Sequence, residues 1–292
     1  MIYPKISVVT PNFNQVNYLE ETILSILNQG YPNLEYIIID GGSTDGSVDI
    51  IKKYQKQLSY WVSEPDNGMY EAIQKGFDKS TGEIMAWINS DDMYYSKSFF
   101  TIGEIFSTLS DVNWLVGVST LYDTIGRSLY AAPSRQFNKF DFYSYDYRWI
   151  QQESCFWRRS LWNKVDASLN TKLKYAGDLD LWLRFFRHET LYTIDALIGG
   201  YRIRGTNQLS YDHFDDYIEE ANKQINEEII SDKDKIILKR YLILRRINRM
   251  ISKFKFINID KLLDYFKKSY FPPIRIIKYD FDNQKFNLHK IN

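Results

Sequence analysis

Short apolar runs alternate with amphipathic segments along the first hundred residues of the chain. Four of these runs have the length of buried strands, and they cover residues 6–10, 34–40, 60–63 and 84–89. Between them, apolar residues recur at helical spacing, as in residues 19–27 and 69–79. Strands that alternate with helices are typical of βαβ units. We therefore expect an α/β fold, Rossmann-like, with a mostly parallel central sheet flanked by helices.

Acidic side chains follow three of the predicted strands. Asp40 and Glu64 end two of them, and the sequence Asn89-Ser90-Asp91-Asp92 ends the fourth. Right-handed crossovers bring the carboxyl ends of parallel strands to one edge of a sheet, so we expect these carboxylates to converge there. Adjacent carboxylate oxygens are suitable ligands for Mg²⁺ or Mn²⁺. The alternative is that the aspartates only form turns and cap the following helices.

Charge and cysteine content add two constraints. The formal net charge is zero, but residues 221–292 contain 17 Lys and Arg against 8 Asp and Glu. The single cysteine, Cys155, excludes a disulfide framework within the chain. The first residues run directly into a predicted strand and no apolar run is long enough to cross a membrane, so we expect neither a signal peptide nor a membrane-spanning helix. We therefore expect a cytoplasmic protein, either free or peripheral on the inner face of the plasma membrane.

Five segments resemble, in order, the motifs of the family 2 glycosyltransferases, which have the GT-A fold. They are SVVTPNFN at residues 7–14, IDGGSTDGS at 39–47, EPDNGMY at 64–70, NSDD at 89–92 and GDLDLWLR at 177–184. The resemblance covers about residues 5–205. It implies a GT-A catalytic domain at residues 1–210, with a nucleotide-sugar half at 1–100 and an acceptor half at 101–210. Residues 211–292 are expected to form a helical, basic extension.

The resemblance implies a role for each motif. A nucleotide-sugar donor, with a UDP-sugar favoured, is expected to bind with Mn²⁺ or Mg²⁺, a Lewis acid for the leaving diphosphate. Asp92 is the expected direct metal ligand, with Asp91 at the donor ribose or in the metal's water shell. Asp178 is the expected general base for the acceptor hydroxyl, and its alternative role is to cap the following helix. The other expected donor-binding residues are Thr10, Pro11, Asn12, Asn14, Asp40, Gly41, Glu64, Asp66, Asn67, Gly68, Asn89, Ser90 and Arg204.

Some positions depart from the family's pattern. Asn89 and Gly41 stand where many relatives have aspartate, so metal affinity is expected to depend on Asp92 and the diphosphate. Arg204 lies where relatives often have histidine, and it either clamps the diphosphate or is a solvated surface charge.

Aromatic residues near these motifs are assigned in two groups. Tyr70 is expected to pack against a sugar or a base. Four tryptophans are expected in the core: Trp87, Trp114, Trp157 and Trp182.

The resemblance implies a metal-dependent inverting glycosyltransferase that moves a single sugar to a glycan or lipid-linked acceptor. Such enzymes assemble bacterial surface polysaccharides, such as lipopolysaccharide or capsule. One alternative is a sugar-nucleotide pyrophosphorylase, which would need a Gly-rich, basic phosphate loop in place of Pro11-Asn12-Phe13-Asn14. Another is a non-catalytic nucleotide-sugar-binding or scaffold protein.

The basic tail has two interpretations. Its helices either lie on an anionic membrane surface or pack on the catalytic domain with a solvated cationic face. No nucleic-acid recognition module accompanies the charge, so a nucleic-acid partner is not expected. The sequence leaves the oligomeric state open.

Overall fold

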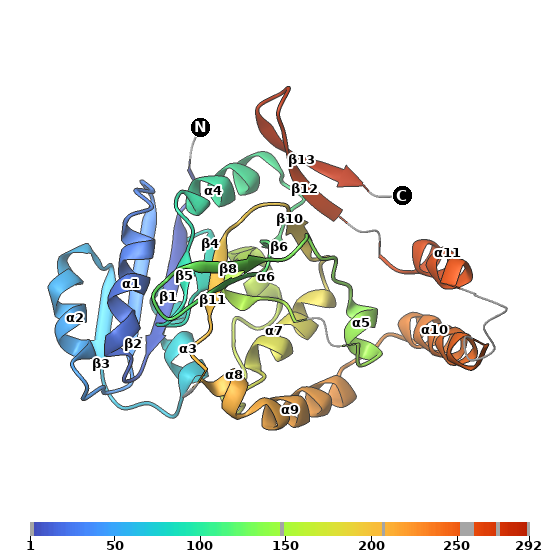
Figure 1. Cartoon of the computed structure of the whole chain (residues 1–292), viewed down its shortest axis with the longest axis horizontal. Helices are drawn as coiled ribbons and strands as arrows, with labels where there is room; N and C mark the ends of the chain where they lie inside the picture. Colours follow the sequence, from blue (N-terminus) through green and yellow to red (C-terminus); the bar gives the residue numbers. More distant parts are fainter. Residues whose placement is uncertain (1–2, 147–148, 206–207, 252–259, 273–274, 291–292) are drawn as a thin grey trace.

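The computed structural model describes residues 3–146, 149–205, 208–251, 260–272 and 275–290. Within them, nine strands form a central sheet in the order β13-β12-β10-β6-β9-β4-β1-β2-β3 (Figure 1). These strands are β1 (Ile6–Asn12), β2 (Leu34–Asp40), β3 (Tyr60–Ser63), β4 (Ile84–Trp87), β6 (Trp114–Val116), β9 (Cys155–Arg158), β10 (Tyr192–Ile194), β12 (Arg275–Asp280) and β13 (Lys285–Lys290). The predicted α/β class is confirmed.

Four neighbouring strands, β4, β1, β2 and β3, are parallel and carry the sequence motifs at their carboxyl ends. Strand β9 is antiparallel to both of its neighbours, β4 and β6, and so interrupts the parallel sheet. In β2, Tyr36 and Ile38 point to one face of the sheet, and Ile37 and Ile39 point to the other. This period of two places an apolar layer on each face.

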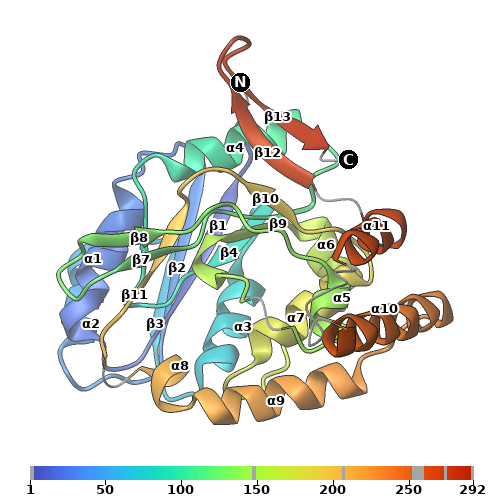
Figure 2. The ribbon, with the colours of Figure 1, turned by 45° about the vertical axis from the view of Figure 1, so that its right-hand side comes forward.

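Helices cover both apolar faces (Figure 2). One core joins the sheet to α1 (Val16–Leu27), α2 (Ser47–Tyr54) and α4 (Ser98–Thr108). The other contains α3 (Met69–Lys79), α6 (Arg159–Lys164) and α7 (Gly177–Phe186), together with α5 (Lys139–Tyr143). Trp87, Trp114, Trp157 and Trp182 are all at most 2% exposed in this second core. The prediction that they are core residues is therefore confirmed.

A smaller sheet covers the carboxyl end of β4. Its strands are ordered β5 (Met93–Tyr94), β11 (Gly199–Arg202), β7 (Thr120–Tyr122) and β8 (Ser128–Ala131). Strand β5 follows directly after the Asn89–Asp92 segment and pairs with β11. This pairing brings Arg202 and Arg204 close to Asp91 and Asp92.

The expectation that residues 211–292 are helical is correct only in part. Helices α8 (Leu209–Asp212), α9 (Phe214–Glu227), α10 (Asp232–Ile251) and α11 (Asp260–Tyr270) are followed by the β12–β13 hairpin. Strand β12 pairs in parallel with β10 of the catalytic sheet. Ile276 and Ile277 are 5% and 0% exposed, so their burial stabilises the hairpin on the sheet edge.

Candidate active site

The carboxyl ends of β1, β2 and β3 meet around the side chain of Asp40. Asp40 is 0% exposed, and its Oδ1 accepts hydrogen bonds from Asn12 Nδ2 and Ser43 Oγ, both at 2.6 Å. Its Oδ2 accepts one from Ser63 Oγ at 2.6 Å and two from the backbone N–H groups of Gly42 and Ser43. Asp40 therefore holds the three strand ends together. Both of its carboxylate oxygens are engaged by these protein groups.

Asp66 approaches the position that Gly41 leaves open. A Cβ atom at Gly41 would lie 2.9 Å from Asp66 Oδ2, so a side chain there would displace this carboxylate. Asp66 Oδ1 accepts the backbone N–H of Gly68 at 2.9 Å, and burial raises the pKa of Asp66. The carboxylate that Gly41 lacks is thus replaced in space by one from the loop after β3.

The other residues expected at the donor edge differ in how exposed they are to solvent. Thr10, Pro11, Asn12 and Ser90 are buried, and the hydroxyl of Tyr36 donates to Thr10 Oγ1 at 3.2 Å. Asn14 is exposed, and its Oδ1 accepts the backbone N–H of Thr44 at 2.9 Å. Glu64, Asn67 and Gly68 are also exposed.

Asp91 and Asp92 lie side by side but have different surroundings. Asp92 is 1% exposed, and its Oδ1 accepts the backbone N–H of Arg202 at 2.8 Å. Asp91 is 9% exposed, and its Oδ2 lies 3.0 Å from Nε of Arg204. Arg204 also donates from Nη1 to Gln15 Oε1 at 2.9 Å, so it joins the end of β4 to the start of α1.

The buried side chain of Arg202 contacts the backbone of the Asn89–Asp92 segment. It is 0% exposed, donates from Nε to the Asp91 carbonyl at 2.6 Å, and pairs with Glu21 at 2.7 Å. Burial raises the pKa of Asp91, while the charge of Arg204 lowers it. Burial also raises the pKa of Asp92 well above its ordinary value, and the neighbouring charges of Asp91 and Glu153 add to the increase.

The arrangement fits a divalent cation held together with a substrate. Among the described residues, no group of three or more His, Cys, Asp and Glu side chains could hold a metal ion by itself. The Nδ2 of Asn89 donates to Asp92 Oδ2 at 3.5 Å, and its Oδ1 is buried without a hydrogen-bond partner. An amide oxygen and one or two carboxylates are the partial ligand set that Mg²⁺ and Mn²⁺ complete with phosphate oxygens.

Asp178 begins α7 and is partly buried. Its Oδ1 accepts the backbone N–H of Leu179 at 2.8 Å and the hydroxyl of Tyr217 at 3.3 Å. Burial raises its pKa from 3.8 to about 6, although both hydrogen bonds lower it. Asp180, two residues further along the helix, instead pairs with Arg184 at 2.8 Å.

Two further residues of this region were not predicted from the sequence motifs. Glu153, in the short 3₁₀ helix η2 (Gln152–Ser154), is 3% exposed, and its Oε1 has no hydrogen-bond partner. Burial raises its pKa to about 8, and the charges of Asp91 and Asp178 contribute to the increase. The sequence feature that could have indicated Glu153 is that it is a charged residue within the run Gln151–Trp157. Phe13, on the loop after β1, is 61% exposed beside the expected donor edge.

The expectation for Tyr70 is wrong. Tyr70 is 3% exposed, and its hydroxyl donates to the carbonyl of Tyr175 at 2.7 Å. Its ring fills the space above Gly177, where a Cβ atom would lie 2.7 Å from it. Tyr70 therefore positions the start of α7 and does not face a ligand.

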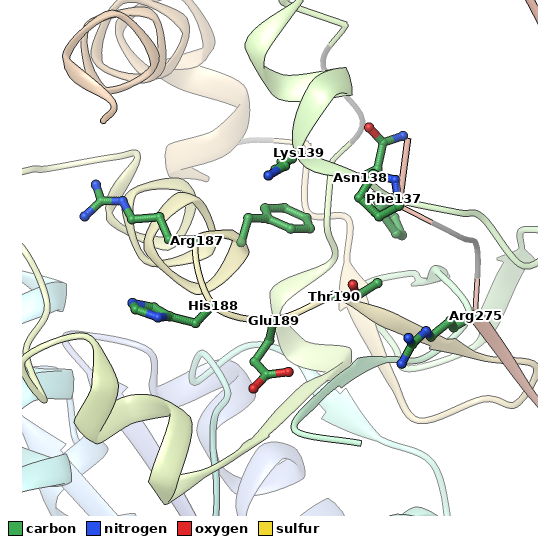
Figure 3. Close-up of a pocket in the computed structure, with 10 residues that line it drawn as sticks. Phe137, Asn138, Lys139, Arg187, His188, Glu189, Thr190 and Arg275 are labelled. Atoms are coloured by element: carbon green, nitrogen blue, oxygen red, sulfur yellow. The ribbon is translucent and has the colours of Figure 1, made fainter. Parts of the chain in front are cut away.

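A separate cavity of about 240 Å³ lies at the opposite end of α7 (Figure 3). Two of its cationic lining residues are engaged in ion pairs, Lys139 with Asp234 at 2.6 Å and Arg187 with Glu228 at 2.7 Å, and a third, Arg275, lies over the ring of Tyr192. None of the predicted site residues lines this cavity.

The fold agrees with comparisons to known proteins. The sequence model of glycosyl transferase family 2 matches residues 7–166, and the chain belongs to this family. An uncharacterized glycosyltransferase of Rickettsia typhi is 28% identical over 195 residues, which are 65% of this chain and 61% of that protein. The putative teichuronic acid biosynthesis glycosyltransferase TuaG of Bacillus subtilis is 36% identical over 94 residues, 31% of this chain and 37% of TuaG.

Solved structures with the GT-A fold are also similar. TarS of S. aureus in complex with UDP-GlcNAc has a TM-score of 0.61 and 18% identity, covering 85% of this chain and 73% of that one. The mannosyltransferase PcManGT of Pyrobaculum calidifontis, in complex with GDP-Man and Mn²⁺, has a TM-score of 0.57 and 16% identity, covering 76% and 65%. The predicted GT-A fold is confirmed.

Proposed function

We propose that this protein is a metal-dependent inverting glycosyltransferase that transfers a single sugar from a nucleotide-sugar to a glycan or lipid-linked acceptor. The observation that carries the proposal is a pair of carboxylate sites, one after a strand of the central sheet and one in the first turn of a helix. Asp91, with Asp92 behind it, lies at the end of β4, and Asp178 lies at the start of α7. Glu153 connects them electrostatically, because its pKa responds to both Asp91 and Asp178.

The donor diphosphate is proposed to lie over Asp91 and Arg204. The bound cation would supply Lewis-acid stabilisation of the leaving diphosphate. Because Asp92 is 1% exposed and accepts a backbone hydrogen bond, Asp91 is the better-placed direct ligand, and the unpaired Asn89 Oδ1 is proposed as a second one. Arg204 can exchange its contact with Asp91 for charge-assisted hydrogen bonds to the diphosphate. Phe13, Asp66 and Asn67 would then line the nucleoside end.

Asp178 is the proposed general base. An acceptor hydroxyl attacks the anomeric carbon in line with the leaving diphosphate and loses its proton to a carboxylate. Both hydrogen bonds of Asp178 described above fall on Oδ1, so Oδ2 is the proposed proton acceptor. A pKa of about 6 leaves the carboxylate mostly ionised at neutral pH and more basic than an ordinary aspartate.

The two alternatives make different demands. A pyrophosphorylase needs a basic phosphate loop after the first strand, and the loop here has no cation between Pro11 and Gln15. A scaffold has no need for a half-buried carboxylate with a raised pKa, which costs stability.

Donor binding and turnover test the proposal. We expect UDP-sugars or other nucleotide-sugars, screened with Mn²⁺, to raise the melting temperature and at least one to be turned over. Asp91→Ala should abolish turnover and Asp92→Ala should lower it, while Asp180→Asn, on the same helix as the base, should retain it. Equal inactivity of the wild type and Asp91→Ala with every common donor would overturn the enzyme proposal.

We also propose that α10 and α11 contact an anionic membrane surface. On α10, the exposed side chains of Ile236, Ile243 and Met250 recur every seven residues and are 54%, 49% and 52% exposed. Lys239, Arg240 and Arg246 flank this line on the same outer face. An apolar strip between cations is typical of helices that lie in a lipid interface. No helix of the described residues is long and apolar enough to span a membrane.

Flotation with liposomes tests the membrane proposal. Binding to vesicles that contain anionic lipid, weakened by salt and by Lys239→Glu/Arg240→Glu, is the expected result. Lys52→Glu/Lys56→Glu, a matched charge change near the other end of the molecule, should bind like the wild type. Absence of salt-sensitive binding would favour helices that merely pack on the catalytic domain.

A further inference from the structure

Aromatic side chains gather beside the carboxylate of Asp178. The ring centroids of Trp149 and Tyr217 are 5.0 Å apart at 77°, and those of Trp149 and Phe214 are 6.0 Å apart at 70°. Trp149 precedes η2, and the other two residues lie in the first turn of α9. Trp149 is 41% exposed and Phe214 is 49% exposed. Trp149, Phe214 and Tyr217 therefore form one open aromatic surface, which we call the Trp149 platform.

The exposure of Trp149 is unusual within this protein. Five of the seven tryptophans are at most 2% exposed, and Trp61 is partly buried. Leaving a large apolar ring in water forgoes the stability that its burial would give. A cluster of such rings next to a candidate catalytic group is typical of a ligand-contacting surface.

The platform is fixed relative to the base. The Tyr217 hydroxyl donates to Asp178 Oδ1 at 3.3 Å, so one residue belongs to both. Glu220, one turn further along α9, accepts the backbone N–H groups of Lys174, Tyr175 and Ala176 at 3.0, 2.8 and 3.0 Å. Helix α9 and the start of α7 are thereby held together, which fixes Phe214 and Tyr217 relative to the base, and Trp149 packs against both of these rings.

We propose that the Trp149 platform binds a sugar ring of the acceptor, so that one of its hydroxyl groups reaches Asp178. This inference rests on the proposed glycosyltransferase function and assigns the acceptor as a glycan, free or lipid-linked, that presents a sugar at this position. A sugar ring has an apolar C–H face that matches an aromatic ring and a polar edge that matches the tyrosine hydroxyl and the carboxylate. A protein partner would need roughly 1,000 Å² of interface, far more than three rings provide.

The platform is tested by glycan binding with matched variants. Saturation-transfer NMR would use the full chain, loaded with UDP and Mn²⁺. The probes are methyl glycosides of glucose, galactose, mannose, rhamnose and N-acetylglucosamine, and their disaccharides, at millimolar concentration. We expect at least one to bind the wild type, Trp149→Ala to weaken binding at least about tenfold, and Trp149→Phe to retain part of it. Phe281→Ala, which removes an 84% exposed ring on the β12–β13 turn, is the control and should bind normally.

The outcomes separate the two proposals. Nucleotide-sugar binding, measured by thermal shift, should be equal in the wild type, Trp149→Ala and Trp149→Phe, because the platform lies at the acceptor side. Glycan binding that survives in Trp149→Ala overturns the platform. If the wild type binds a nucleotide-sugar but none of the glycosides, the platform proposal is also overturned, while the glycosyltransferase proposal remains in place. Failure to bind any nucleotide-sugar would overturn both.

Discussion

Asp178→Asn should make the protein more stable while abolishing its activity. Burial raises the pKa of the Asp178 carboxyl from 3.8 to about 6, so its ionised form is disfavoured in the folded state. A shift of about two units corresponds to about 3 kcal/mol, and contact with solvent reduces the expected gain to about 2 kcal/mol. Asparagine keeps the Oδ1 acceptor for Leu179 and Tyr217, so the variant loses no hydrogen bond there.

The pH dependence gives the sharper test. Since the folded pKa lies above the unfolded one, the protonated carboxyl stabilises the fold below pH 4, and this contribution is lost as the pH rises through about 6. The wild type and Asp178→Asn should therefore have similar free energies of unfolding near pH 4. The variant should be more stable by about 2 kcal/mol at pH 7.5.

Urea unfolding at both pH values measures this difference, with Asp180→Asn as the control. Asp180 pairs with Arg184 on the same helix, so its loss should cost about 0.5 kcal/mol without following the same pH profile. Asp178→Asn that is less stable than the wild type at pH 7.5 would refute the burial argument. For turnover, the same pKa predicts a rate that falls as the pH drops below about 6.

Three further predictions follow from individual contacts. Arg204→Ala should raise the donor KM at least about tenfold, and Arg204→Lys should be intermediate because lysine lacks the planar guanidinium. Arg187→Ala, at the separate cavity, is the control, and unchanged donor kinetics in Arg204→Ala would refute the proposed contact of Arg204 with the diphosphate. Asn89→Asp should bind Mn²⁺ more tightly than the wild type but be less stable without Mn²⁺, because a second carboxylate would then face Asp92. Equal Mn²⁺-dependent shifts in the melting temperatures of the variant and the wild type would contradict this. Gly76→Ala should lower the free energy of unfolding by about 1–3 kcal/mol, because its Cβ would lie 2.4 Å from Val9 Cγ1; an unaffected urea midpoint would disprove the close packing of α3 on β1.

The strand half of the fold was predictable from local pattern. Residues 34–40 are apolar on both faces, as parallel strands covered by helices must be, and the acidic turns follow from strand direction. The C-terminal hairpin was not predictable in this way. Its charged residues flank Ile276, Ile277 and Phe286, which become buried because β10 offers a free edge.

The site was predictable as a set of carboxylates but not as a set of contacts. Asp40 is a motif residue whose carboxylate is consumed by five protein donors, which spacing cannot reveal. The pairing of Arg204 with Asp91 joins residues 113 positions apart. Likewise, the burial of Tyr70 depends on Gly177, more than a hundred residues away. Such long-range contacts are decided by tertiary packing, for which a single sequence carries no local signal.

The most direct test of the central claim is ¹H NMR of donor turnover by the wild type and Asp178→Asn, with Mn²⁺ and a panel of nucleotide-sugars. The account predicts that one donor's anomeric signal disappears with the wild type, that the transferred or hydrolysed sugar appears with the opposite anomeric configuration, and that Asp178→Asn shows neither change. Retention of configuration, or equal turnover by Asp178→Asn, would contradict it.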